Sequence, residues 1–588
     1  MSIEQLKKVW KSPLVENART RRYQDRIDAS IDENLKQIRE QAKQATDPFH
    51  PPSNFAFCWF SSLSKWQGNE ELFDLCALAI ERWADRSLAD EISDLSKWDH
   101  SWSFGGIAYI FGMIEEALPD AARARFLEAC ARNAPTAIHR DNMGTVGNQV
   151  ISGIIGDLLY GHLLDNEEYL SIARERFNEF GPLIIMDNGQ ANEQYGPCPN
   201  YSSGAFAGVF SYVLIEELEE WRPRLLKSLE WFRWMHTESL YLFPGPSTRM
   251  YYSRRMLHLP LHCFAALEYA AETQPMFLDF RDRYESIIGD YGRGHINSTD
   301  TTSIQVNTRE TSEANPEQLA EWNAPVTEFF ETTWFRRSPI KYSIIRRRYQ
   351  TAITYMGWLP MLGLQTWAWG DEPPIIHSLY GATSGTQAWG IDTAAKPADH
   401  YFYGHGAGLM APAVVWRPDG GSQEGQPDEL PFTTWRHGEL IQMAIFTDVS
   451  TVIIHTGKTG RRVTRWALNP IEPSAPIIDD GVVRFEDRVG RLYSLKGRPE
   501  IEEATGTFRE KDEQRPVTRL AWSFEENDTA FAFSNDSFEF VKDELAESRY
   551  LEFKDETGTY RADISTILDE DGYLNRNEVT CDVRRISL

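Results

Sequence analysis

The chain has 588 residues and a formal net charge of −27, from 60 basic and 87 acidic side chains. A chain of this length is expected to hold roughly two to four domains, each large enough for its own core. Its 19 Trp, 23 Tyr and 31 Phe exclude global disorder. The acidic balance disfavours a protein that coats nucleic acid, and an anionic substrate would need a local basic patch.

The beginning of the sequence lacks the apolar segment of a signal peptide. No run of about 18 apolar residues predicts a membrane span. As written, the sequence predicts a cytoplasmic protein, while a secreted or periplasmic one stays open because a chain trimmed of a leader would look the same. The six cysteines form no CxxC pair, which argues against a disulfide framework and a thiolate zinc site.

The first half of the chain is patterned for helices. Across residues 17–44, apolar side chains such as Ile27, Ile31 and Leu35 recur at spacings of three and four, which predicts an amphipathic helix. Further helices are predicted near residues 70–86, 103–118, 120–133, 142–164, 166–179, 203–219, 223–236 and 260–272. Their short connections favour stacked helical hairpins, in a solenoid or a closed α/α toroid.

The second half is patterned for strands. Residues 296–325 are polar and predict a linker, and the runs after it are rich in β-branched and aromatic residues. Strands are predicted at residues 342–349, 351–358, 441–449, 451–455, 516–524, 529–534 and 548–553. Because no helices intervene, the sheet should be antiparallel. We predict an α+β multidomain chain, with an (α/α) toroid at 1–300, a linker at 301–325 and an antiparallel β-sandwich at 326–588.

A loop at residues 187–210 is the most informative stretch for function. It is rich in Gly, Pro and Asn and precedes a helix expected from about Ser203. Long irregular loops in compact domains are usually functional, although prolines and tyrosines can also simply pack a loop. The polar and aromatic residues ahead of this helix are Glu193, Gln194, Tyr195, Asn200 and Tyr201.

Asn148 lies in the first turns of the helix predicted at 142–164, near its positive end. An amide there can donate a hydrogen bond to a ligand carboxylate. The alternative is that Asn148 only caps or packs the turn.

Two stretches hold basic residues and no acid. Residues 241–263 contain Arg249, Arg254 and Arg255 beside Tyr252, and residues 334–370 contain a run of three arginines at 346–348. In a chain of charge −27 these stretches could line an anion-binding cleft, or they could be solvated.

Histidines and tryptophans supply the remaining candidates. His400 and His405, near Asp399, could ligate a metal or supply one catalytic imidazole, and His437 and His455 could complete a metal set. The run at 98–102, with His100 and Trp102, could form an aromatic platform for a sugar or could pack in the core.

The chemistry of these residue types favours β-elimination. No GxxxxGK[ST], GxSxG or HExxH motif occurs, so phosphoryl transfer and serine hydrolysis have no support. In a uronic acid, hydrogen bonds or positive charge on the carboxylate stabilise the enolate that forms when the C5 proton leaves. A tyrosine or neutral histidine can take that proton, and a tyrosine can protonate the leaving oxygen.

The sequence resembles the toroid-type polysaccharide lyases, which include heparinase II/III-like, alginate, hyaluronate and chondroitin lyases. The loop NGQANEQYGPCPNYSSGAF is similar to their Gly-rich loop, and it follows an Asn near a helix start. The resemblance implies Tyr201 as the catalytic tyrosine and Asn148 as the amide that neutralises the substrate carboxylate. If the loops are aligned on the next aromatic residue, Phe206 takes the tyrosine position instead.

Two further motifs carry the resemblance. The SRR run that ends with Arg254 and Arg255 is similar to the arginine motif of the hyaluronate lyases. The segment DHYFYGHGAG is similar to the histidine-rich segment of the heparinases, which implies His405 or His400 as a site residue. The sequence departs from the pattern at Asn188 and at Gln194, where the relatives carry Asp and His.

We therefore predict a carbon–oxygen lyase of carbohydrate metabolism that cleaves a uronate-containing poly- or oligosaccharide by β-elimination and leaves a 4,5-unsaturated end. The catalytic residues are predicted to be Tyr201, Asn148, His405, Arg254 and Arg255. The substrate-binding residues are predicted to be Glu193, Gln194, Tyr195, Tyr252, Arg249, Trp102 and His100. No cofactor is required for this chemistry, and a structural divalent metal at His400 and His405 stays open.

Three other functions stay open. A toroid glycoside hydrolase would need two carboxylates roughly 5–9 Å apart, for which Glu193 with Asp187 or Asp99 is the available pair. A uronate C5 epimerase would abstract the same proton and return it on the other face. A non-catalytic carbohydrate-binding protein would use the same aromatic and basic residues.

Overall fold

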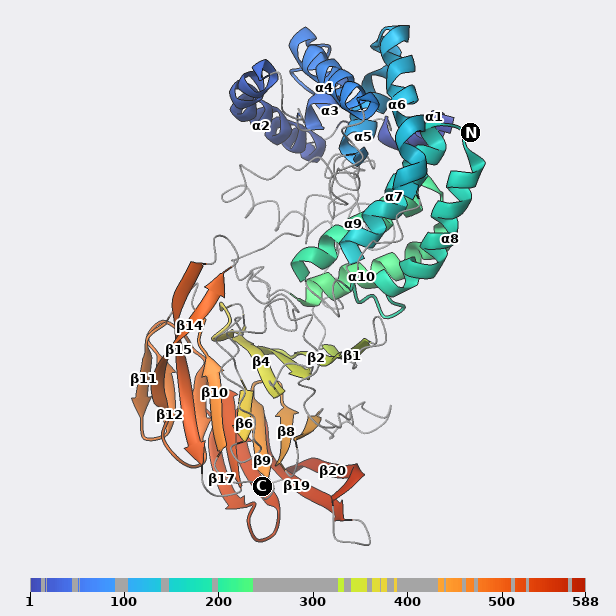
Figure 1. Cartoon of the computed structure of the whole chain (residues 1–588). Helices are drawn as coiled ribbons and strands as arrows, with labels where there is room; N and C mark the ends of the chain where they lie inside the picture. Colours follow the sequence, from blue (N-terminus) through green and yellow to red (C-terminus); the bar gives the residue numbers. More distant parts are fainter. Residues whose placement is uncertain are drawn as a thin grey trace. The chain divides into compact units, whose positions relative to one another are not determined.

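The computed structural model divides the chain into two compact units (Figure 1). One unit holds helices α1–α9 and most of α10, and the other holds every described strand. The structure describes residues 2–11, 16, 18–44, 51, 53–89, 104–138, 147–192, 199–235, 326–332, 340–356, 362–370, 372–377, 385–388, 432–437, 440–456, 462–469, 474–508, 513–524, 528–568 and 574–586. The predicted linker at 301–325 and the helix at 260–272 lie outside these ranges.

Ten α-helices are described in the first part of the chain. They are α1 (Ser2–Trp10), α2 (Ala18–Lys43), α3 (Asn54–Phe60), α4 (Glu70–Leu88), α5 (Phe104–Ile114), α6 (Asp120–Ile138), α7 (Gly147–Leu163), α8 (Glu167–Ile184), α9 (Pro199–Ile215) and α10 (Arg222–Trp234). The helices predicted within the described ranges are confirmed, whereas α1 and α3 had not been predicted. None of the described helices is long and apolar enough to cross a membrane.

Local sequence explains where several helices begin and what they bury. Asn69 accepts a hydrogen bond from Leu72 N at the start of α4, and Asn166 accepts two at the start of α8. Such side chains satisfy backbone N–H groups that lack a partner within the helix. On α2, four residues of the apolar stripe, Ile27, Ile31, Leu35 and Ile38, are buried.

Helices α7, α8 and α9 form an up-down-up set. A Cβ added at Gly161, near the end of α7, would lie 2.5 Å from Leu170 Cδ2, near the start of α8. A Cβ added at Gly208 of α9 would lie 2.7 Å from Ile151 Cγ2 of α7. A Cβ added at Gly147, at the start of α7, would likewise lie 3.6 Å from Ala205 Cβ of α9. Helices α7 and α9 are therefore parallel neighbours, and α8 runs in the opposite direction between them in the chain. This is the predicted hairpin stacking.

The second unit contains antiparallel strands in four sheets. The strands are β1 (Val326–Thr332), β2 (Ile340–Arg346), β3 (Gln350–Met356), β4 (Leu362–Trp369), β5 (Ile376–His377), β6 (Gly385–Ala388), β7 (Phe432–His437), β8 (Leu440–Phe446), β9 (Thr451–Thr456), β10 (Arg462–Ala467), β11 (Pro476–Asp479), β12 (Val482–Phe485), β13 (Arg491–Ser494), β14 (Glu500–Phe508), β15 (Glu513–Phe524), β16 (Thr529–Ser534), β17 (Glu539–Glu544), β18 (Tyr550–Asp555), β19 (Gly558–Leu568) and β20 (Leu574–Ile586). The sheet orders are β1-β2-β3-β4-β5, β14-β15-β10-β6, β11-β12-β13-β16-β9-β8-β7 and β17-β18-β19-β20. In the seven-stranded sheet, Phe446 of β8 lies opposite Thr451 of β9. Thr451 lies in turn opposite Phe533 of β16. Every ladder between described strands is antiparallel, as predicted.

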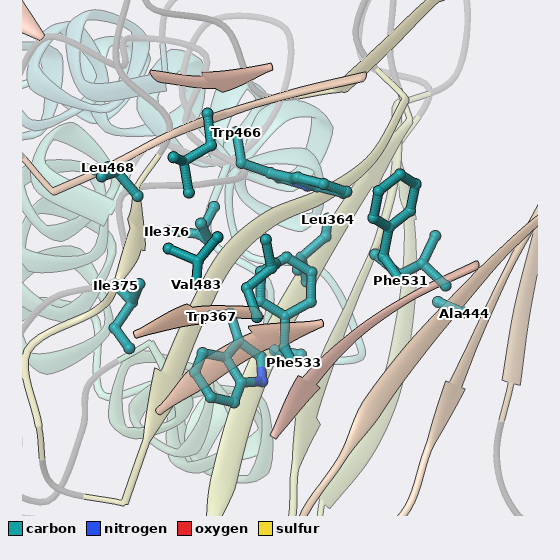
Figure 2. Packing of buried hydrophobic residues seen from close by; sticks show 14 of the residues in the cluster. Leu364, Trp367, Ile375, Ile376, Ala444, Trp466, Leu468, Val483, Phe531 and Phe533 are labelled. Atoms are coloured by element: carbon teal, nitrogen blue, oxygen red, sulfur yellow. The ribbon is translucent and has the colours of Figure 1, made fainter. Parts of the chain in front are cut away.

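The central strands of the seven-stranded sheet, β8, β9 and β16, are buried on both faces. In β16, Phe531 and Phe533 belong to a core cluster that includes residues of β4, β10 and β15. Figure 2 shows the two phenylalanines packed with Trp367 and Trp466. The alternate residues Ala530 and Ala532 belong to a second cluster, shared with β18, β19 and β20. The unit therefore has strands packed on both sides of this central sheet.

Candidate functional site

A tight turn follows α8 and leads into the loop that was predicted to be functional. Ile185 and Ala191 form an antiparallel bridge, and Met186 N donates to Gln190 O at 3.0 Å. Gly189 has a φ of +84°, and a Cβ added there would come within 3.0 Å of the Lys227 carbonyl oxygen in α10. Only glycine fits this position without strain. We call residues 185–192 the 185–192 turn.

Two buried amides fix the 185–192 turn from within. Gln190 and Asn192 are 0% and 1% exposed. Gln190 Nε2 donates to Asn192 Oδ1, and Asn192 Nδ2 donates to Leu183 O at 2.9 Å. Asn192 N also donates to Ile184 O at 2.8 Å. These two residues are structural parts of the turn, which the sequence had not singled out.

Helix α9 begins earlier than predicted. Its first residue is Pro199, not Ser203, so Asn200 and Tyr201 belong to the first helical turn and not to the preceding loop. The reason is that proline is well suited to the first turn, where its missing N–H is not needed. Ser202 Oγ, fully buried, donates to Ala191 O at 2.6 Å and ties this first turn to the 185–192 turn.

Helix α7 begins against the same turn. A Cβ added at Gly147 would lie 2.5 Å from Asn192 O and 3.6 Å from Ala205 Cβ in α9. Asn148 is the next residue of α7 and is 4% exposed. Ala205 is four residues after Tyr201, which corresponds to about 6 Å along the helix axis. The backbones of Asn148 and Tyr201 thus lie on the first turns of two adjoining helices, at their positive ends.

Phe206 is not a site residue. It is fully buried, and its ring centroid lies 6.2 Å from that of Phe210 and 5.7 Å from that of Phe232, in an edge-on contact. The alignment that would place Phe206 at the catalytic tyrosine position therefore places it in an apolar core.

Asp187 ties the turn to α10. Its side chain is 88% exposed and forms an ion pair with Arg224, which also donates to Ile185 O at 3.2 Å. Lys227 Nζ donates to the Asp187 carbonyl oxygen at 3.2 Å. An exposed, ion-paired carboxylate lacks the apolar surroundings of a catalytic acid. This weakens the hydrolase alternative that pairs Asp187 with Glu193.

The other predicted site residues lie outside the described residues. They are Glu193, Gln194, Tyr195, His100, Trp102, Arg249, Tyr252, Arg254, Arg255, His400 and His405, together with Asp99 of the hydrolase alternative. Within the described ranges, no group of three or more His, Cys, Asp or Glu could hold a metal ion. His455 is fully buried, with its ring edge-on to Phe531 at 5.3 Å, so it is a core residue and a poor candidate ligand.

A buried carboxylate on α7 lies away from these helix starts. Asp157 is 2% exposed and ion-paired with Arg176 of α8. Burial raises the pKa of its carboxyl to about 7, against the opposing effect of Arg176. Asp157 is ten residues after Gly147, about 15 Å along the axis, so it is not part of the candidate site.

Asp157 should make stability depend on pH. The native pKa of about 7 is higher than the value of about 3.9 expected in the unfolded chain, so the native state binds the proton more tightly. The free energy of unfolding should therefore fall as the pH rises from about 4 to about 7. Between pH 5 and pH 8, urea denaturation should show a loss on the order of 2 kcal/mol that is absent in Asp157→Asn. The exposed Asp120→Asn should keep the wild-type trend, and an equal trend in all three proteins would contradict the assignment.

Known structures share this fold. A chondroitin AC lyase variant from Streptomyces coelicolor A3 matches 96% of this chain and 88% of its own, with a TM-score of 0.58 and 14% identity. A structure of chondroitinase AC lyase matches 96% and 88%, with a TM-score of 0.52 and 12% identity. A heparan sulfate lyase from Pedobacter heparinus matches 86% and 80%, with a TM-score of 0.48 and 12% identity. No family model and no curated protein matches the sequence.

These structures belong to the toroid polysaccharide lyases, the group that the sequence resembles. The predicted resemblance is confirmed at the level of the fold. The two chondroitin lyase structures match nearly the whole chain, so the fold extends over both units.

Proposed function

We propose that this chain is a polysaccharide lyase that cleaves a uronic-acid-containing poly- or oligosaccharide by β-elimination. The observation that carries the proposal is the meeting of two helix starts at the 185–192 turn. It puts Asn148 and Tyr201 on adjoining first turns, in a fold whose matched structures are lyases. Two of these structures are named for chondroitin, so a chondroitin-type uronate polymer is the first substrate to test.

Asn148 would act on the substrate carboxylate. Its amide can donate a hydrogen bond, and the first turn of α7 adds the positive end of the helix dipole. Both effects stabilise the negative charge that develops on the carboxylate when the C5 proton leaves. Asn148 is 4% exposed, and a hydrogen bond in surroundings of reduced dielectric is stronger than one in water.

Tyr201 would transfer a proton. As a base it takes the C5 proton, and as an acid it protonates the glycosidic oxygen that leaves C4. Free tyrosine has a pKa near 10, so a tyrosinate at neutral pH needs nearby positive charge. The start of α9 and the predicted arginines Arg254 and Arg255 are the proposed sources of that charge.

The remaining predicted residues enter the proposal on sequence grounds. Substrate contacts are assigned to Glu193, Gln194, Tyr195, Tyr252, Arg249, Trp102 and His100. His405 is the proposed second proton-transfer group. The elimination needs no cofactor, and a structural divalent metal at His400 and His405 is kept as part of the proposal.

The test is a panel of uronate polymers, starting with chondroitin, followed by ultraviolet absorbance. Elimination creates a double bond between C4 and C5 that is conjugated with the carboxylate, and this bond absorbs. New reducing ends without absorbance would favour a hydrolase. Exchange of the C5 hydrogen with deuterated solvent, without absorbance or cleavage, would favour an epimerase. Binding without any of these changes would favour a carbohydrate-binding protein.

A further inference from the structure

We propose that the 185–192 turn is a positioning element that fixes the first turn of α9 against the first turn of α7. In this role, Ser202 and Gly147 set the distance between Tyr201 and Asn148. The inference rests on the proposed function, because it assigns a role to residues that touch neither the substrate nor the reacting atoms.

The turn is held rigidly by the helices around it. Asn192 is bonded to the end of α8 through its side chain and its backbone N–H, and Gly189 packs against the Lys227 carbonyl of α10. Arg224 of α10 adds an ion pair to Asp187 and a hydrogen bond to Ile185 O. Because α8 and α10 hold the turn in place, the turn can fix the positions of α7 and α9, whose first residues contact it.

Each of the two helix starts has its own connection to the turn. On α9, the Ser202 hydroxyl donates to Ala191 O at 2.6 Å, and Ser202 follows Tyr201 directly. On α7, Gly147 lies directly before Asn148, and the absence of a side chain lets the Asn192 carbonyl approach. The Ala191 carbonyl thus accepts a hydrogen bond from the start of α9, and the neighbouring Asn192 carbonyl packs against the start of α7.

The contact at Gly147 is specific to that position. A Cβ there would lie 2.5 Å from Asn192 O, so the atoms must separate by about 1 Å to reach an ordinary van der Waals distance. A Cβ at Gly156, on the same helix, meets no atom within 4 Å. Substituting alanine at the two positions therefore compares a displaced helix start with an undisturbed one.

The size of the expected effect follows from the geometry of proton transfer. A displacement of about 1 Å between groups that act together can cost about 10²-fold in rate. The displacement alters the alignment of Tyr201 with the C5 proton more than it alters the area of contact with the polymer. The loss should therefore appear in kcat, with little change in KM.

The experiment measures kcat, KM and the melting temperature of four variants on a uronate polymer that the wild type cleaves. Gly147→Ala is matched with Gly156→Ala, and Ser202→Ala is matched with Ser30→Ala. Ser30 is buried on α2, where its hydroxyl donates to the Ile27 carbonyl at 2.9 Å and accepts from Asn54 Nδ2 at 2.9 Å. This variant therefore loses the same kind of hydroxyl–carbonyl bond, and one further bond, away from the site. We expect kcat to fall at least tenfold in Gly147→Ala and Ser202→Ala, and to stay within twofold in the two controls.

Several outcomes would overturn the proposal. These are an unchanged kcat in folded Ser202→Ala and Gly147→Ala, a loss confined to KM, and an equal loss of kcat in the controls. If Gly147→Ala fails to fold, Ser202→Ala decides the question alone. Wild-type protein that releases no unsaturated product from any uronate polymer would overturn the proposed function, and the positioning role with it. Wild-type activity that survives in all four variants would overturn the positioning role alone.

Discussion

Tyr201→Phe should lose about 10²- to 10⁴-fold in kcat on a uronate polymer, the usual contribution of a general acid or base. The substitution keeps the ring and removes only the transferable proton. The connection between the first turn of α9 and the 185–192 turn runs through Ser202, which this substitution leaves in place. The melting temperature should therefore stay close to that of the wild type.

The matched control for this prediction is Tyr212→Phe. Tyr212 lies on the same helix, eleven residues after Tyr201, with its ring stacked on Phe177 at 3.9 Å. Burial raises the pKa of its hydroxyl, which suits a core residue and not a base. The Tyr212→Phe variant should keep wild-type kcat.

The rival assignments give different results. If Tyr201→Phe stays within about threefold of wild type while Tyr195→Phe is inactive, Tyr195 is the proton-transfer residue. If both variants still release unsaturated product at the wild-type rate, the base is a histidine, and His405→Ala is the next variant to assay.

Helices could be predicted well from the sequence because their apolar periodicity is local. The stripe of α2 and the window that became α7 were both read from spacing alone. The start of α9 was missed because the residues around Pro199 resemble a loop in composition. Proline and asparagine are common both in loops and at helix starts, and only the packing against Ala191 selects the helix.

The sheets could be predicted less completely. Runs rich in β-branched and aromatic residues predicted strands, and the lack of intervening helices predicted antiparallel pairing. The number of layers depends on which strands bury both faces. Strand β16, with the sequence TAFAFS, is buried at every position. Such a continuous run is the signal of a strand covered on both sides, and it could have predicted the central sheet.

Part of the candidate site could be predicted, and part depends on the tertiary structure. Asn148 and Tyr201 were selected from their residue types and their places in the sequence. The role of Gly147 arises from its contact with Asn192, which lies 45 residues later in the chain, and sequence spacing cannot reveal such a contact. The Asn188-Gly189 pair gave a turn signal, but no sequence feature indicated which helices the turn would join.

Asn148→Ala should lower kcat by about 10²- to 10³-fold, the usual cost of removing one hydrogen-bond donor to a developing negative charge. Asn148→Asp should be at least as impaired, because it replaces the donor with a carboxylate that repels the substrate carboxylate. Both losses should be largest for substrates with a free carboxylate. A substrate whose uronate is esterified carries no charge there, so the Asp variant should lose less on it.

The matched control is Asn166→Ala, at the start of α8. Asn166 accepts hydrogen bonds from Glu168 N and Tyr169 N, and the loss of this cap should cost about 0.5–2 kcal/mol of stability. Its kcat should match the wild type at temperatures where the protein stays folded. If Asn148→Ala behaved in the same way, with lower stability and unchanged kcat, Asn148 would be a packing residue at the start of α7. The carboxylate of the substrate would then have to be neutralised by the arginines, and Arg254→Ala and Arg255→Ala would be expected to carry the loss instead.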